Sequence, residues 1–377
     1  MKKILVINTK YKIFGGEDSN IIEELSFLKK HYEVEYLQFD NSNKLTVYEA
    51  IAFFTCNNFK SNKLIEKKVN EFNPDIAYVH NTWFSANLGI FRVLEKLNVP
   101  VVLKIHNFRF NCTKYFSLKK HLDENKMCPG CGIKRKRFSF FNKYFENSYL
   151  KSFFVIIYGK KYLKVLKGKK IKIVVLNSFY KKIFEKITEN VENLFVAHNP
   201  IKVTDDFRYN PESDYVVYAG SISEEKGINE LSNLWKKLNL DLRLVLIGPG
   251  EFIKDKNVSN ILFTGPLENK ETLNYIKNSR AVITATKMYE GQPRLLSEAS
   301  SYGVPSIYPS FGGMDEYFPS NYNLSFDQFD YEDLAKKISI LQDKEILIEE
   351  SKKINENINK YFSEHNYFEN FRSIILN

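Results

Sequence analysis

The chain has 377 residues, 44% of them hydrophobic and 27% charged, with a formal net charge of +10. These values are typical of a globular enzyme and exclude an intrinsically disordered chain. The length suits two α/β domains better than a single core. The longest candidate for a membrane span, Phe153–Tyr158, has six apolar residues, whereas crossing a bilayer takes about 20. We therefore expect a globular protein without a transmembrane segment.

The first residues resemble the start of a signal peptide, because two lysines precede an apolar run. That run, Ile4–Ile7, stops after four residues at Asn8, which favours a first buried strand instead. Four cysteines in the chain are too few for a disulfide scaffold. The sequence thus predicts a protein of the reducing cytoplasm.

Short β-branched runs alternate with longer amphipathic stretches through the first half of the chain. Apolar residues at helical spacing mark segments such as Ser19–Lys30 and Lys63–Phe72. Buried strands separated by helices indicate a doubly wound, mostly parallel sheet. The strands expected in this half are Lys3–Ile7, Glu33–Leu37, Ile76–Val79, Val101–Ile105 and Ile171–Leu176.

The alternation stops at Asn199–Ser213, which holds two prolines and no periodic apolar face, and we interpret this segment as a linker. The expected fold class is therefore α/β, with two Rossmann-like domains, 1–200 and 201–360, whose parallel sheets face a central cleft. Ligands of such sheets bind outside the carboxyl ends of the strands, so the cleft is the expected site. The strands expected in the second half are Tyr215–Ala219, Arg243–Ile247, Asn260–Phe263, Ala281–Thr284 and Pro305–Tyr308.

Two acidic residues flank a glycine turn at a strand-to-helix junction of the second half. Pro293 suits the first turn of a helix, and Gly303 followed by Pro305 ends it. Glu290 is then in the loop before the helix and Glu298 is inside it. The backbone N–H groups at such a helix start attract an anion. Taken alone, the spacing is explained equally well by two acids that only cap and solvate.

This pair resembles the E-x7-E element of glycosyltransferase family 4, retaining transferases of the GT-B fold that include the group 1 glycosyltransferases of surface polysaccharide synthesis. The resemblance implies that Glu290 contacts the hydroxyls of the donor sugar and takes part in catalysis. It implies that Glu298 binds the ribose of the donor nucleotide. Donor contacts are also implied for their neighbours Gly291, Gln292, Arg294 and Leu295.

A second loop resembles the family's diphosphate-binding loop. Gly220 follows a strand, and Lys226 matches the lysine that binds the donor diphosphate and assists catalysis. Ser221 stands where the family has arginine, which removes a bidentate phosphate contact. The site is then weaker, or another cation substitutes, or activity is lost. Arg294 is the nearest substitute, although its four-residue spacing to Glu298 favours a pairing along the helix.

Further glycines at strand ends, Gly248 and Gly265, match the order and spacing of the family and are expected donor contacts. In the first half, Gly15 and Gly16 follow the first strand, where glycine allows close approach of a ligand. The resemblance places Gly16 at the donor. His106 matches the family's histidine beside the donor sugar and reaction centre, and is expected to be catalytic.

The expected acceptor contacts come from the ends of the first-domain strands. His80 and Asn81 end one strand, and Asn107 follows His106 at the end of the next. A structural histidine with satisfied hydrogen bonds is the favoured interpretation of His80. The acceptor-binding residues expected in this half are Gly15, His80, Asn81, Asn107 and Arg109.

The sequence contains no Asp-x-Asp metal motif, and the resemblance implies a metal-independent enzyme without a cofactor. Cys128 and Cys131 have zinc-knuckle spacing, and Cys112 or His121 could complete a structural site. A reduced loop without metal is the favoured alternative, because there is one CxxC pair.

Residues 134–172 contain thirteen lysines or arginines and a single acid, Glu146. Aromatic residues interleave with them, and Phe141, Tyr144, Phe145 and Tyr149 share one helix face. A basic helix with an aromatic face is typical of attachment to an anionic membrane surface. A core-facing helix with a solvated lysine side is the alternative.

The sequence predicts a hexosyltransferase that uses a nucleotide-sugar donor and a glycan or lipid-linked oligosaccharide acceptor, at the inner face of the plasma membrane. The resemblance implies that residues 361–377 form a helix returning to the first domain. One rival is a nucleotide-sugar epimerase of the same fold. The other, a basic nucleic-acid-binding protein with a CxxC loop, does not explain glycines and acids at successive strand ends, so we expect no nucleic-acid partner.

Overall fold

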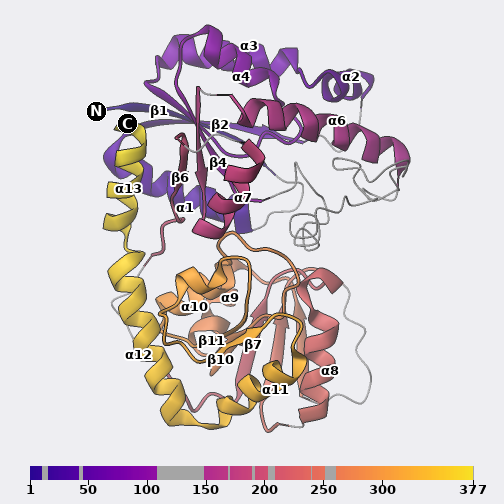
Figure 1. Ribbon diagram of the computed structural model, residues 1–377, viewed down its shortest axis with the longest axis vertical. Coiled ribbons are helices and arrows are strands. Elements are labelled where there is room, and N and C mark those ends of the chain that lie inside the picture. The colour runs from indigo at the N-terminus through magenta and orange to yellow at the C-terminus, as the bar shows by residue number, and fades with distance from the viewer. Residues whose placement is uncertain are drawn as a thin grey trace. The chain divides into compact units, whose positions relative to one another are not determined.

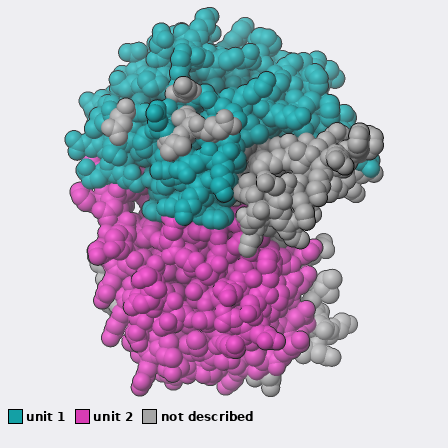
Figure 2. All heavy atoms as spheres, in the orientation of Figure 1, with its two compact units in different colours: residues 1–199, 369–377 teal, residues 200–368 magenta. Residues whose placement is uncertain are grey.

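The computed structural model of the protein describes residues 1–10, 16–41, 46–107, 148–168, 170–188, 192–202, 209–238, 240–250 and 260–376. The chain forms two compact units, coloured separately in Figure 2. Unit 1 contains residues 1–199 together with 369–377, and unit 2 contains residues 200–368.

Unit 1 is built on a six-stranded parallel sheet in the order β2-β1-β3-β4-β5-β6 (Figure 1). Every residue of the central strands β3 and β4 is buried, as expected for a parallel sheet covered on both faces. The strands are β1 (Lys3–Lys10), β2 (Glu33–Asp40), β3 (Ile76–Val79), β4 (Val101–Ile105), β5 (Ile171–Val175) and β6 (Leu194–Val196).

Local signals set the helix boundaries of unit 1. Thr46 forms a capping box with Glu49 at the start of α2, and the Asn58 side chain caps the start of α3. The helices are α1 (Gly16–His31), α2 (Val47–Thr55), α3 (Phe59–Phe72), α4 (Gly89–Lys96), α6 (Tyr149–Leu166) and α7 (Ser178–Thr188). The last residues of α13 (Glu364–Leu376) also belong to this unit.

Unit 2 repeats the architecture with a parallel sheet in the order β12-β11-β10-β7-β8-β9 (Figure 1). Its strands are β7 (Tyr215–Ala219), β8 (Arg243–Ile247), β9 (Ile261–Gly265), β10 (Ala281–Ile283), β11 (Ser306–Ser310) and β12 (Ser325–Asp327). Its helices are α8 (Ile228–Leu238), α9 (Asn269–Lys277), α10 (Arg294–Ser301), α11 (Tyr331–Ser339) and α12 (Lys344–Tyr361). Short 3-10 turns are η2 (Glu224–Lys226), η3 (Met314–Tyr317) and η4 (Ile340–Gln342).

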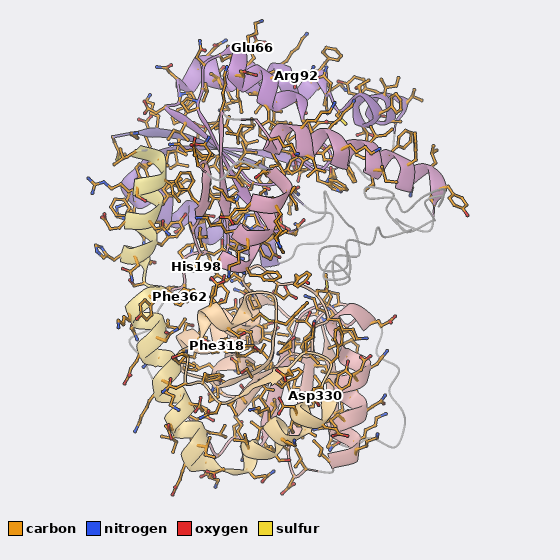
Figure 3. All side chains as sticks on the ribbon, in the orientation of Figure 1. Glu66, Arg92, His198, Phe318, Asp330 and Phe362 are labelled. Carbon is orange, nitrogen blue, oxygen red and sulfur yellow. The ribbon has the colours of Figure 1, made fainter. Side chains whose placement is uncertain are left out.

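The core of unit 2 lies between its sheet and its helices. Trp235 of α8 is fully buried and donates its indole N–H to Leu242 O at 3.1 Å. Phe318 stacks on Tyr308 with ring centroids 4.2 Å apart. Asp330, labelled with Phe318 in Figure 3, caps α11 by accepting from two backbone N–H groups. Packing and caps together hold the strand ends that carry the candidate site.

The predicted α/β fold with two parallel Rossmann-like sheets is confirmed. The structure extends β1 and β2 by three residues each beyond the expected strands and adds the three-residue strands β6 and β12. It also starts α3 at Phe59, four residues before the expected Lys63, because Asn58 supplies the N-cap. Short edge strands leave too few alternating residues to be seen in sequence.

Candidate functional site

Glycines bring the carboxyl ends of neighbouring unit 2 strands into backbone contact. Gly220 N–H donates to Ile247 O at 2.9 Å. A Cβ at Gly248, whose φ is +141°, would lie 2.0 Å from Gly220 O. A Cβ at Gly227 would lie 2.1 Å from Ala285 O, in the loop after β10. Glycine is therefore required where the loops after β7, β8 and β10 converge.

Lys226 and Glu290 meet at this edge of the sheet although they come from different loops. Lys226 ends η2, and its ammonium forms an ion pair with Glu290 Oε1. Thr286 Oγ1 donates to the same carboxylate oxygen at 3.1 Å. Both charged side chains are partly buried. The structure thus joins the predicted phosphate-binding lysine to the predicted sugar-binding carboxylate in one cluster.

Tyr218 supports the loop that contains Ser221, the residue that stands where the family has arginine. Its hydroxyl donates to Ser221 O at 2.9 Å. Burial raises the pKa of Tyr218 despite the neighbouring charge of Lys226, so the phenol stays protonated and donates. The Ser221 side chain is exposed. The loop is therefore anchored through its backbone, and Ser221 adds no charge to it.

Helix α10 contains the second predicted carboxylate. Arg294 Nε donates to Glu298 Oε1 at 2.5 Å, which is the pairing along the helix that the four-residue spacing predicts. Gly291 O accepts from the Tyr317 hydroxyl at 2.9 Å, and Gln292 lies 3.4 Å from Ser297 Oγ. These contacts fix the turn between the two acids.

Two of the predicted donor residues have plain structural explanations. Leu295 is buried and belongs to the hydrophobic core of unit 2. Gly265 has φ +73°, a left-handed conformation that favours glycine, and a Cβ there would meet nothing within 4 Å. Leu295 is therefore a packing residue of α10, and Gly265 is set by its backbone conformation.

Sequence reasoning missed a second lysine near the cluster. Lys287, in the loop between β10 and Glu290, forms a 2.6 Å ion pair with Glu230 of α8. Burial lowers the pKa of Lys287, but the hydrogen bond and charge of Glu230 outweigh burial and raise it. The sequence signal that could have identified Lys287 is its position three residues before Glu290. A second lysine in an ion pair thus lies on the loop that contains Glu290, the acid predicted to bind the donor sugar.

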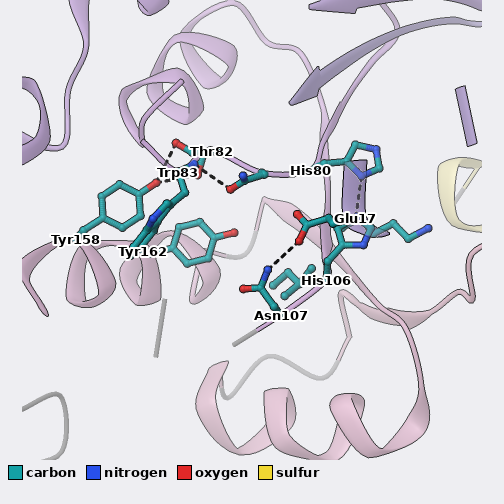
Figure 4. A pocket seen from close by; sticks show the side chains of 11 residues that line it. Glu17, His80, Thr82, Trp83, His106, Asn107, Tyr158 and Tyr162 are labelled. Carbon is teal, nitrogen blue, oxygen red and sulfur yellow. Dashed lines mark hydrogen bonds between the residues drawn. The ribbon is translucent and has the colours of Figure 1, made fainter. Parts of the chain in front are cut away.

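Unit 1 has a pocket at the carboxyl ends of its strands (Figure 4). His80 Nδ1 and His106 Nε2 are 3.0 Å apart, and their rings are stacked. Asn107 Nδ2 donates to Glu17 Oε2 at 3.0 Å. The pocket is lined by Glu17, His80, Asn81, Thr82, Trp83, Lys104, Ile105, His106, Asn107, Tyr158 and Tyr162. The structure therefore brings together His80, Asn81, His106 and Asn107, the four described residues predicted for this edge.

A buried ion pair beneath the histidines was not predicted. Lys104 Nζ lies 2.8 Å from Glu24 Oε1, both side chains are almost completely buried, and the Tyr78 hydroxyl donates to the same oxygen at 2.7 Å. Burial, followed by the charge of Lys104, holds the pKa of His80 well below its usual range. Burial, His80 and Lys104 do the same for the pKa of His106. Both imidazoles are therefore neutral at physiological pH.

The opposite wall of this pocket is aromatic. Trp83 and Tyr158 pack edge to face with ring centroids 4.7 Å apart. The Tyr158 and Thr82 hydroxyls are hydrogen-bonded at 2.9 Å (Figure 4). Asn81 donates to Thr9 O at 2.7 Å and accepts from the Trp83 N–H at 3.0 Å. Asn81 thus has the structural role of joining β1 to the loop after β3.

Several predictions lie outside the described residues. These are Gly15, Arg109, the cysteines Cys112, Cys128 and Cys131 with His121, and the part of the basic stretch before Ser148. Gly16 is the first residue of α1. Within the described part of the chain, no three His, Cys, Asp or Glu side chains are arranged to hold a metal ion. No helix in that part is both long and apolar enough to cross a membrane.

Comparison with known families identifies unit 2. Residues 203–361 match the family described as glycosyl transferases group 1. Unit 2 is a group 1 glycosyl transferase domain. The matched segment contains every donor-binding residue predicted from the sequence except Gly16. It therefore includes the strand ends, the Lys226–Glu290 pair and α10.

One relative in sequence is the putative teichuronic acid biosynthesis glycosyltransferase TuaC of Bacillus subtilis (strain 168). It is 26% identical over 130 residues, which are 34% of this chain and 33% of the relative. The match thus spans about a third of that protein's length. It agrees with the group 1 assignment.

Solved structures share the fold over the whole chain. Anabaena Alr3699/HepE, solved with UDP and glucose, has a TM-score of 0.68 at 11% identity and covers 100% of both chains. The lipopolysaccharide outer core galactosyltransferase WaaB has a TM-score of 0.66 at 16% identity and covers 99% of both chains. A glycosyltransferase from Rickettsia africae has a TM-score of 0.67 at 13% identity, covering 99% and 97%. The fold is therefore the predicted GT-B fold.

Proposed function

We propose that this protein is a retaining glycosyltransferase. It moves a sugar, a hexose by our prediction, from a nucleoside diphosphate sugar to a glycan or lipid-linked oligosaccharide acceptor in surface polysaccharide synthesis. One observation carries the proposal. Lys226 and Glu290, from separate loops, form one charged cluster at the carboxyl edge of a group 1 glycosyl transferase domain.

The donor would bind by exchanging partners within that cluster. Lys226 leaves Glu290 for the donor diphosphate, where a cation offsets the charge that develops on the leaving group. Glu290, relieved of the ammonium, accepts hydrogen bonds from the sugar hydroxyls. Glu298, on α10, exchanges its bond to Arg294 for the ribose hydroxyls. Catalysis then consists of positioning and of stabilising the leaving phosphate.

The absence of an Asp-x-Asp motif supports metal-independent transfer, with protein cations neutralising the leaving diphosphate. Lys287, which is paired with Glu230 on the loop before Glu290, offers a second cation in place of the positive charge that is lost at Ser221. In this proposal Lys287 substitutes for the family's arginine, because it lies three residues before Glu290 on the same loop. Both lysines have carboxylate partners that can rotate away when phosphate binds.

The pocket of unit 1 is the proposed acceptor side. An aromatic wall with a few polar groups opposite is the usual composition of a small-molecule pocket. The neutral His106 can accept or donate one hydrogen bond to a sugar hydroxyl, and Glu17 and Asn107 offer further polar atoms. We assign catalysis to His106 and acceptor binding to Asn107. His80 is assigned to the acceptor side through its hydrogen bond to His106.

The names of the relatives support the substrate class. HepE was solved with UDP and glucose, and TuaC is named for teichuronic acid biosynthesis. Neither name fixes the base, the sugar or the acceptor used by this chain. We place the protein in the cytoplasm, at the inner face of the plasma membrane, where lipid-linked acceptors are extended.

A screen of thermal stability with UDP-, GDP-, ADP- and CDP-sugars tests the proposal. A true donor at 100 times its dissociation constant stabilises the protein by about 2.7 kcal/mol. The stabilising donor is then incubated with and without a glycan acceptor, and the products are separated. Transfer that requires acceptor supports the proposal, whereas a new sugar nucleotide formed without acceptor identifies an epimerase. Stabilisation by none of these compounds contradicts both.

A further inference from the structure

The two histidines of unit 1 are brought together by the register of two neighbouring strands. β3 and β4 are parallel, with Tyr78 opposite Val102. Because successive side chains of a strand point to opposite faces, every second residue along the two strands faces the same side. The side chains on that side are, in turn, Tyr78, His80, Lys104 and His106. The backbone therefore fixes the distance between the two imidazoles.

Each imidazole uses one nitrogen in a hydrogen bond to the other. His80 Nδ1 lies 3.0 Å from His106 Nε2 (Figure 4). Within the described part of the chain, neither ring makes a second hydrogen bond. His106 lines the pocket and is partly exposed, whereas His80 is 3% exposed. Nδ1 is therefore the ring nitrogen of His106 that remains for a ligand.

Buried aromatic contacts hold the ring of His80 in place. Tyr78 packs edge to face on His80 with ring centroids 4.5 Å apart. Phe371 of α13 packs on Tyr78 from the same unit, with centroids 5.1 Å apart. The Tyr78 hydroxyl is itself fixed by its hydrogen bond to Glu24. His80 thus has little freedom to turn its Nδ1 away from His106.

One hydrogen atom lies between the two rings. Burial, with a further contribution from the charge of Lys104, lowers the pKa of both histidines, so both are neutral at physiological pH. A neutral imidazole has a proton on one nitrogen and a lone pair on the other. One histidine therefore donates and the other accepts, and this choice determines the tautomer of both.

The surroundings of His80 favour this residue as the donor. If His106 donated, the proton of His80 would be on Nε2, for which the described part of the chain offers no acceptor. A buried N–H group without an acceptor is rarer in native proteins than an unsatisfied acceptor. The positive charge of Lys104 also favours a lone pair over an N–H group on the His80 ring. His80 then donates through Nδ1, and the proton of His106 is on its own Nδ1.

We propose that His80 is a positioning residue that holds His106 in its Nδ1–H tautomer, so that His106 presents a fixed hydrogen-bond donor to a ligand oxygen in the unit 1 pocket. In this tautomer the one basic nitrogen of His106, Nε2, accepts from His80. His106 therefore orients an oxygen of the ligand and does not remove a proton from the acceptor hydroxyl. The tautomer depends on unit 1 alone, whereas its effect on transfer rests on the proposed function.

NMR of the histidine rings tests the tautomer without requiring activity. The full-length protein is labelled with 15N in its six histidines, and correlations from the ring C–H protons to both ring nitrogens are recorded at neutral pH. Spectra of His80→Leu and His106→Gln assign the two rings. In the wild type we expect both rings to have a protonated Nδ1 and a bare Nε2, and in His80→Leu we expect His106 to exchange between two tautomers. A proton on Nε2 of His106 in the wild type overturns the proposal.

Steady-state kinetics with the donor found in the stability screen measures the effect on transfer. His80→Leu should lower kcat about two- to tenfold, the loss expected for one hydrogen bond. His80→Asn should retain most of the wild-type kcat, because its amide nitrogen can take the place of Nδ1. His31→Leu is the matched control, since His31 is exposed at the end of α1 and should leave kcat unchanged. Wild-type kcat in His80→Leu, or equal losses in the Leu and Asn variants, contradicts a positioning role.

A double-mutant cycle tests whether His80 acts through His106. In a His106→Gln background, His80→Leu should leave the residual kcat unchanged, because no second imidazole remains to be held. An equal fold loss of kcat in both backgrounds would show that His80 acts independently of His106 and would overturn the proposal. Thermal unfolding of each variant checks that folded protein is compared.

The spectra and the kinetics separate this inference from the proposed function. If the wild type transfers no sugar from any donor, the proposed function fails, and the NMR spectra still decide the tautomer of His106. If the wild type transfers sugar and His80→Leu has the wild-type kcat, the proposed function stands and the positioning role of His80 fails.

Discussion

The two units gather polar side chains at the same place, the carboxyl edge of a parallel sheet, by different physical means. In unit 2, glycines bring backbones together, and partly buried ion pairs such as Lys226–Glu290 remain at the surface. In unit 1, neutral histidines sit above a fully buried ion pair, Lys104–Glu24, and face aromatic rings. The first arrangement can exchange its charges with a ligand. The second holds the Lys104–Glu24 pair inside the protein and presents neutral imidazoles and aromatic rings beside the carboxylate of Glu17.

This contrast matches the chemistry of the two proposed ligands. A diphosphate requires mobile or accessible cations, because a phosphate must replace the carboxylate partner of each lysine. A sugar hydroxyl requires a hydrogen-bond partner of fixed orientation, and a neutral imidazole or amide can be that partner. Burial, with a further contribution from the charge of Lys104, lowers the pKa of both histidines of unit 1 and keeps them neutral.

The largest expected effect is on the stability of unit 1. Lys104→Met leaves the Glu24 carboxylate buried without its ammonium, which should cost about 3–5 kcal/mol. The double variant Lys104→Met, Glu24→Leu should recover part of this loss because no charge remains buried. The chain has two tryptophans, Trp83 in unit 1 and Trp235 in unit 2, so urea unfolding in a Trp235→Phe background reports unit 1. Wild-type stability of the single variant would show that the buried pair is not coupled to folding.

The next effect concerns the exchangeable charge of unit 2. Glu290→Ala should slow transfer roughly ten- to a hundredfold, since a hydrogen bond to a charged group contributes about 1.5–3 kcal/mol. Steady-state kinetics with the donor found in the screen measures it. Glu212→Ala is the control, because Glu212 also forms an ion pair with a lysine, Lys344, but on an exposed surface. Unchanged kcat in the Glu290 variant would remove Glu290 from the site.

Glycine substitutions test whether backbone contact builds the unit 2 edge. Gly248→Ala places a Cβ against Gly220 O and should destabilise unit 2 by about 1–3 kcal/mol while weakening donor binding. Gly265→Ala meets open space and incurs only the left-handed backbone cost of about 1–2 kcal/mol. Thermal unfolding and donor titration of both variants provide the comparison. Equal donor affinity in the two variants would argue against close approach of the loops as a requirement.

Acid should weaken unit 1 through its histidines. Their folded-state pKa values are lowered, so below about pH 6.5 the unfolded chain binds protons that the folded chain does not. Stability is then lost as pH falls, by up to about 1.4 kcal/mol per pH unit for each histidine. Urea unfolding of the wild type and of a His80→Asn variant between neutral and acidic pH measures the slope. A slope that His80→Asn leaves unchanged would exclude His80 as a source.

The smallest expected effect is that of chelation. Because Lys226 and Lys287 supply the positive charge, EDTA should leave transfer unchanged. Loss of turnover that magnesium or manganese restores would contradict a lysine-based leaving-group mechanism. Loss of folded protein would point instead to structural zinc at Cys112, Cys128 and Cys131, and metal analysis distinguishes the two.

Much of unit 2 could be predicted because its signals are local. Glu290, Pro293 and Glu298 lie within nine residues, and helix chemistry alone places them around one turn. The partner of Glu290 could not be found this way, since Lys226 is 64 residues away and the contact depends on strand order. The order β10-β7-β8 is what brings the three loops together.

Unit 1 was less predictable for the same reason. His80 and His106 could be placed at strand ends, but their hydrogen bond follows from β3 and β4 being neighbours in register. Lys104 lies inside an apolar strand, and the sequence alone does not reveal which acidic residue pairs with it. Glu24, on α1, is 80 residues earlier.

Titration calorimetry with the nucleoside diphosphate of the best donor tests the central claim most directly, because it measures binding to unit 2 without requiring an acceptor. Glu298→Ala should weaken this binding roughly ten- to a hundredfold by removing a charged hydrogen-bond acceptor for the ribose. Glu290→Ala should bind the nucleoside diphosphate nearly as the wild type does, since that carboxylate is assigned to the sugar, and Glu212→Ala should be unchanged. Wild-type affinity in the Glu298→Ala variant, or the absence of any nucleotide binding by the wild type, would contradict the account.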